Sequence, residues 1–73
     1  MYLRLPDGTR HRVGKRTIFE IVLITTDCDA ELRIRTPRGK FKHVSYHASK
    51  EKAEQKLAEI KAAINRGDNV FCV

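Results

Sequence analysis

The chain has 73 residues, of which 41% are hydrophobic and 33% are charged, and its formal net charge is +6. This length and composition predict one small folded domain, residues 1–73, and exclude a largely disordered chain. No apolar run approaches the roughly 20 residues of a membrane-spanning helix, and the N-terminus lacks the apolar core of a signal peptide. We therefore expect a cytoplasmic protein that has no membrane partner.

Residues 2–13 are predicted to form a β-hairpin around the turn Pro6-Asp7-Gly8. Proline presets the first turn position, and glycine takes the left-handed position that closes a three-residue loop with a bulge. Such a loop pairs Leu5 with Thr9. One face of the hairpin then carries Leu3, Leu5, Thr9, His11 and Val13. The other face carries Tyr2, Arg4, Arg10 and Arg12.

Residues 18–25 are predicted to form the central strand of the fold, after a basic connector at residues 14–17. They make the only run with apolar side chains at both alternating positions, so both faces need a cover. A helix can cover one face, and either the N-terminal hairpin or a second copy of the chain covers the other, so a homodimer is possible. We expect this strand to end at Thr25 or Thr26, before a turn at residues 27–29.

A second hairpin is predicted over residues 30–46, around Pro37-Arg38-Gly39, with the same loop chemistry as the first. A bulged loop places the apolar residues on one face, because that register covers the larger apolar area. The inward face then holds Ala30, Leu32, Ile34, Val44 and Tyr46. The outward face holds Arg33, Arg35, Phe41 and His43.

The C-terminal third predicts an amphipathic helix that begins after Ser49 and ends before Gly67. Serine is a favoured N-cap, and glycine supplies the left-handed residue that ends many helices. An apolar stripe at helical spacing is formed by Ala53, Leu57, Ile60 and Ile64. Residues 69–73 are expected to add a short final strand or to dock as a tail.

These elements predict an α+β fold, in which a small β-hairpin and a three-stranded antiparallel meander form an SH3-like or barrel-like sheet, packed by one C-terminal helix. The element order of residues 2–66 resembles the small archaeal chromatin proteins that have an SH3-like barrel. That resemblance implies binding of duplex DNA through a triple-stranded sheet. The same order is similar to pleckstrin-like fragments and to small phage proteins that block host enzymes. No residue motif accompanies these likenesses, so no binding residues are carried over from them.

The positive charge is concentrated in the part of the chain that predicts strands. Residues 1–48 hold ten Lys and Arg against five Asp and Glu, a charge of +5 of the total +6. Seven of those ten cations are arginine, whose planar guanidinium donates paired hydrogen bonds to phosphate or carboxylate. This bias favours an anionic partner over a surface that is charged only for solubility.

We predict a non-enzymatic module that binds nucleic acid, DNA or RNA, through the outward face of the two hairpins. Cations would follow the phosphates and aromatic rings would stack on bases. The predicted contact residues are Tyr2, Arg4, Arg10, Arg12, Arg33, Arg35, Arg38, Lys40 and Phe41. The alternatives are a protein-interaction module or small inhibitor that binds an acidic protein surface, and a basic strand exterior that only prevents aggregation.

The sequence predicts no metal site, cofactor or catalytic residue. His43 and His47 have a metal-like spacing, but neither Cys28 nor Cys72 has the neighbouring cysteine of a C-x2-C site. Neither a third orienting group nor an oxyanion element accompanies a Cys–His pair. Two reduced thiols are expected, with a disulfide as the alternative.

Overall fold

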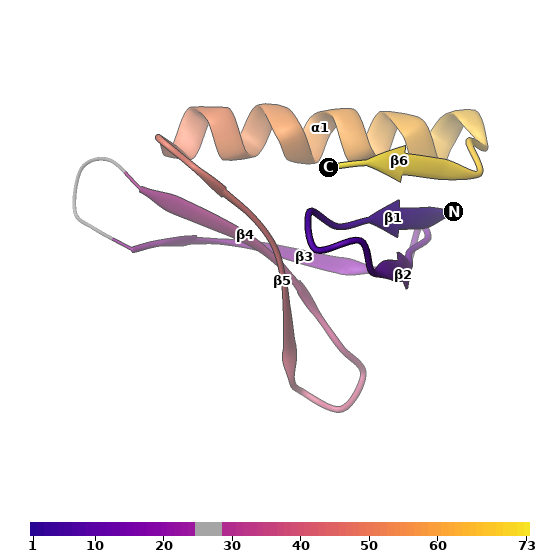
Figure 1. Cartoon of the computed structure of the whole chain (residues 1–73), viewed down its shortest axis with the longest axis horizontal. Coiled ribbons are helices and arrows are strands. Elements are labelled where there is room, and N and C mark those ends of the chain that lie inside the picture. The colour runs from indigo at the N-terminus through magenta and orange to yellow at the C-terminus, as the bar shows by residue number, and fades with distance from the viewer. Residues whose placement is uncertain (25–28) are drawn as a thin grey trace.

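The computed structural model describes residues 1–24 and 29–73, and the described residues form strands and one helix of an α+β domain (Figure 1). The predicted fold class is therefore confirmed. The elements in chain order are β1 (Tyr2–Arg4), β2 (Arg10–Arg12), β3 (Ile18–Leu23), β4 (Ala30–Arg35), β5 (Phe41–His47), α1 (Lys50–Arg66) and β6 (Val70–Cys72).

The first sheet has the strand order β2-β1-β6, so strands from both ends of the chain form it. β1 and β2 pair in the predicted hairpin register, with Leu3 opposite His11. The loop closes as expected, since the Leu5 amide donates to the Thr9 carbonyl at 2.8 Å and Gly8 has a φ of 87°. The final residues form a strand, β6, which pairs with β1 in parallel.

The second sheet has the order β3-β4-β5, which makes β4 the central strand and β3 an edge. The prediction that residues 18–25 form the central strand is therefore wrong. Alternate β4 residues, Ala30, Leu32 and Ile34, are fully buried, whereas Ile18 and Leu23 of β3 are more than half exposed. Phe19 and Ile21 of β3 pack against the core, whereas Ile18 on the other face is exposed, so the strand is covered on one face and not on both. The expected strand end at Thr25 or Thr26 and most of the following turn lie outside the described residues.

The β4–β5 hairpin has the expected three-residue loop, but β5 contains a second irregularity. Arg33 lies opposite His43 while Leu32 lies opposite Ser45, so Val44 is an extra residue in β5. This bulge reverses the alternation of side chains, and Val44 and Ser45 are both buried. The prediction that Tyr46 faces inward is wrong for this reason, because its side chain lies on the outward face and is 66% exposed.

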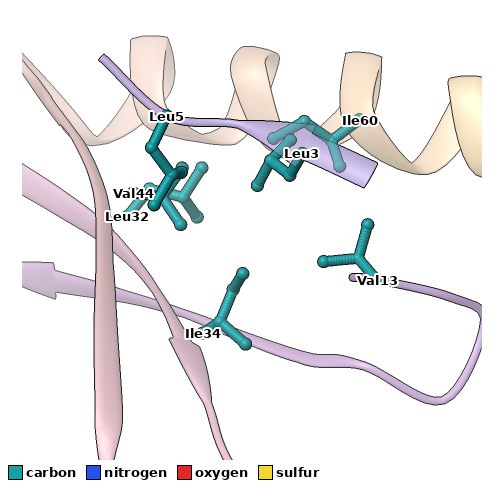
Figure 2. Packing of buried hydrophobic residues seen from close by; sticks show 7 residues of the cluster. All are labelled: Leu3, Leu5, Val13, Leu32, Ile34, Val44 and Ile60. Atoms are coloured by element: carbon teal, nitrogen blue, oxygen red, sulfur yellow. The ribbon is translucent and has the colours of Figure 1, made fainter. Parts of the chain in front are cut away.

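The core lies between the two sheets and the helix (Figure 2). Its buried side chains come from all three parts of the fold: Leu3, Leu5, Val13, Leu32, Ile34, Val44 and Ile60. Burial of a Leu, Ile or Val side chain contributes about 1.5–3 kcal/mol of transfer free energy, so these few residues supply most of the folding force. One shared core means that each sheet has one inward and one outward face.

Helix α1 begins and ends where the sequence predicts. The Ser49 side chain accepts a hydrogen bond from the Lys52 amide, and Gly67 has a left-handed φ of 78° with its amide bonded to the last helical carbonyls. The buried face includes Ala53, Ile60 and also Ala63, which the predicted stripe omits. No helix in the described part of the chain is long and apolar enough to cross a membrane.

Replacement of Ile60 by valine should lower the free energy of unfolding by about 0.5–1.5 kcal/mol, because the lost methylene leaves a gap where the helix meets both sheets. Urea denaturation of dilute protein measures this change. The same replacement at Ile18, which is 56% exposed, should change stability by less than about 0.5 kcal/mol. Equal losses for the two variants would contradict the assignment of Ile60 to the core.

Candidate nucleic-acid interface

The nine predicted contact residues occupy three places on the molecule. Because both sheets bury their alternate residues in one core, their outward faces are two different surfaces of the molecule. The first sheet carries Tyr2, Arg4, Arg10 and Arg12. The second sheet carries Arg33, Arg35 and Phe41, and the tip of the β4–β5 hairpin carries Arg38 and Lys40.

The outward face of the first sheet is called the arginine face here and consists of two cross-strand rows. The two rows are Arg12-Tyr2-Val70 and Arg10-Arg4-Cys72. All six side chains are exposed, and none of them is a carboxylate. Directly opposed like charges destabilise a strand pair, and Arg4 lies directly opposite Arg10. The arrangement therefore leaves positive charge concentrated on a flat surface.

None of the three arginines of this face forms an ion pair with any residue that the structure describes. Their guanidinium groups keep their full complement of donors for an external anion. Tyr2 lies between Arg12 and Val70 and is 46% exposed, so its ring is accessible beside the cations. This face combines the two chemical elements that a phosphate-linked chain of bases requires.

The outward face of the second sheet is charge-compensated. Arg33 Nε lies 3.8 Å from a Glu31 carboxylate oxygen, and Arg35 Nε lies 3.5 Å from one of Glu20. Both guanidinium groups also lie over the Phe41 ring, at 4.4 Å and 5.4 Å from its centroid. These contacts compensate the two positive charges and cover the aromatic face within the molecule, although the buried Arg33 Nε has no hydrogen-bond partner among the described residues. An external anion would have to compete with them.

Glu31 also holds His43, whose Nδ1 lies 2.7 Å from a carboxylate oxygen. The His43 ring packs against Tyr46, with 4.3 Å between the ring centroids. The sequence predicted the outward side chains but not this network. A signal was present, because Glu20 and Glu31 alternate onto the same outward face as Arg33 and Arg35 once the register of the strands is known.

Arg38 and Lys40 are exposed at the tip of the β4–β5 hairpin, which projects away from the rest of the molecule in Figure 1. Neither forms an ion pair with the described residues.

A groove of about 800 Å³ connects the two sheets at one end of the fold. Arginines from the first sheet, the connector and the second sheet line it: Arg12, Arg16 and Arg35. Its apolar lining includes Val13, Ile18 and Ile34, and none of its lining residues is acidic. The groove therefore extends the positive surface of the arginine face around the β2 edge.

Residues 1–24 and 29–73 contain no cluster of His, Cys, Asp or Glu side chains that could hold a metal ion. His43 is held by Glu31, and His47 lies with Nε2 2.7 Å from the Ser45 hydroxyl. Cys72 is a free, exposed thiol, while Cys28 lies outside the described residues.

Comparison of the chain with models of known protein families, with curated proteins and with solved structures gives no significant match.

Protonation of His47 should couple folding to pH. Burial lowers its pKa, and the positive charge of Lys56 lowers it further. His47 in the folded state therefore takes up a proton only at a lower pH than in the unfolded state, where its pKa has the ordinary value of 6.5. The free energy of unfolding should be highest above that value and should fall as the pH decreases below it.

Urea denaturation at several pH values between about 7.5 and 5.5 measures this loss. His47→Gln keeps a polar side chain next to Ser45 but cannot take up the proton, so its loss of stability over the same range should be smaller. An identical pH dependence in the two proteins would show that His47 is not responsible.

Proposed function

We propose that this protein is a non-enzymatic module that binds nucleic acid through the arginine face. The observation that carries the proposal is the cluster of three adjacent arginines, Arg4, Arg10 and Arg12, without a carboxylate partner among the described residues. An anionic ligand would remove the repulsion between these cations. A chain of phosphates with stacking bases matches both the arginines and Tyr2.

The geometry of the strands supports binding of an extended anionic chain. Arg10 and Arg12 are two residues apart on β2, so their Cα atoms are separated by about 6.6–7 Å, and Arg4 lies beside Arg10 on the neighbouring strand. Phosphates would therefore be contacted at intervals along one direction. The groove continues this path through Arg12 to Arg16, which would lengthen the contact.

Contacts of this kind go mainly to the phosphate backbone, so binding should be weakly sequence-specific and strongly salt-dependent. The roles expected for Arg33, Arg35 and Phe41 stay predictions. Their use would require displacement of Glu20 and Glu31, which at present neutralise the two arginines.

An acidic protein surface is the second candidate partner. Tyr2 and Val70 are both exposed next to the arginines, and tyrosine and arginine dominate the binding energy of many protein interfaces. The cytoplasmic location expected from the sequence stays a prediction.

The decisive measurement is fluorescence anisotropy with labelled random single-stranded DNA, RNA and duplex DNA at several salt concentrations. Three phosphate contacts predict a slope of log K against log salt of about −2 for a single strand. Arg4→Ala/Arg10→Ala should weaken binding to every sequence and flatten this slope to about −0.7, because one contact remains.

Lys52→Ala/Lys61→Ala is the matched control, since it removes the same charge from exposed positions of helix α1 that are not among the predicted contact residues. Its affinity and salt slope should stay close to those of the unmodified protein. Equal weakening by both double variants would show that net charge alone, and not the arginine face, attracts the nucleic acid. Absence of binding at low salt would remove the proposal and favour the acidic protein partner.

A further inference from the structure

The four outer strands of the two sheets differ in how their edges are protected. An exposed edge strand is a template for pairing with another chain, and soluble proteins protect edges with short strands, charges, bulges or proline. β2 and β6 have three residues each, and β2 carries two arginines. β5 has the bulge at Val44 and the partly buried Lys42, which faces inward next to Ile34.

β3 has none of these protections. It has six residues in regular pairing with β4, and it contains no proline, lysine or arginine. Its one charged residue, Glu20, pairs with Arg35 on the neighbouring strand. Exposed apolar side chains lie at both ends of this edge, since Ile18, Leu23 and Ile24 are between 51% and 56% exposed. An edge of this composition requires a cover.

The hydrogen-bond pattern identifies which backbone groups of β3 are available. The Ile24 amide donates to the Asp29 carbonyl at 2.9 Å, so Ile24 is a hydrogen-bonded position of the β3–β4 pair. Such positions alternate in an antiparallel pair, so Val22, Glu20 and Ile18 also direct their backbone groups toward β4. The amides and carbonyls of Phe19, Ile21 and Leu23 therefore point to the open edge.

We propose that two copies of this chain form a dimer through antiparallel pairing of their β3 strands, with the two-fold axis at Ile21. Ile21 then lies opposite the partner's Ile21, Phe19 opposite the partner's Leu23, and Ile18 opposite the partner's Ile24. The free groups of Phe19, Ile21 and Leu23 provide hydrogen-bonded pairs in the correct phase, and each side chain meets one on the same face.

The length of the paired segment and the position of Glu20 favour this register over the neighbouring registers. It uses all of residues 18–24 symmetrically, whereas a shift that centres the axis on Glu20 would oppose two carboxylates. The β3-β4-β5 sheets of the two copies become one six-stranded sheet, and one isologous contact covers the open β3 edge of each copy. The interface includes Ile18 of the groove but none of Arg4, Arg10 and Arg12, so the oligomeric state can be measured without nucleic acid, separately from the proposed function.

A pair of variants tests both the contact and its register by sedimentation velocity over a range of protein concentrations. Ile18→Lys/Ile24→Lys places lysine opposite lysine twice and should weaken dimerisation at least about tenfold. Ile18→Lys/Ile24→Glu places lysine opposite glutamate twice and should restore the dimer. Both positions are exposed in the monomer, so circular dichroism should show the same fold for all three proteins.

Hydrogen exchange followed by NMR gives an independent measurement on the unmodified protein. The amides of Phe19, Ile21 and Leu23 should become protected as the concentration rises, whereas those of Glu20 and Val22 should be protected throughout. A monomer at every concentration would overturn the proposal. A dimer that both double variants leave unchanged, or that Ile18→Lys/Ile24→Glu fails to restore, would also overturn it.

Discussion

The shared core is the constraint on which the rest of the structure depends. Neither sheet has enough apolar side chains to be stable alone, since each has three strands and the first has strands of only three residues. Leu3 of the first sheet, Ile34 of the second and Ile60 of the helix meet in one cluster. This shared core gives each sheet one inward face and one outward face.

The two outward faces differ in whether their arginines are paired with carboxylates. On the second sheet Arg33 and Arg35 are paired with Glu31 and Glu20 and packed on Phe41, so this face has little net charge to offer. On the first sheet the three arginines form no ion pair with any residue in the described ranges. A long-range attraction for anions therefore arises from one side of the molecule, and the field there is strengthened by the absence of carboxylates from that face.

Local signals in the sequence were sufficient for the turns, the helix and its caps, because Gly8, Gly39, Ser49 and Gly67 each act through their immediate neighbours. The sequence could not reveal which strand is central, since apolar residues on both faces of a strand have the same appearance at an open edge and in a buried sheet. The bulge at Val44 was also hidden, because no glycine marks it. The division of the arginines into two faces depends on sheet packing, which alternation within one hairpin does not determine.

The parallel pairing of β1 with β6 joins residues that are nearly the whole chain apart, and it includes a hydrogen bond from the Val73 amide to the Arg4 carbonyl at 3.0 Å. Contacts with such a large sequence separation are costly to form, because closure of the intervening loop lowers the conformational entropy of the chain. The second sheet and helix can be assembled from contiguous residues, whereas β1 gains its second neighbour only when the last residues dock. The surface that bears Arg4 and Tyr2 thus depends on both ends of the chain, and removal of residues 69–73 would leave β1 as an edge strand.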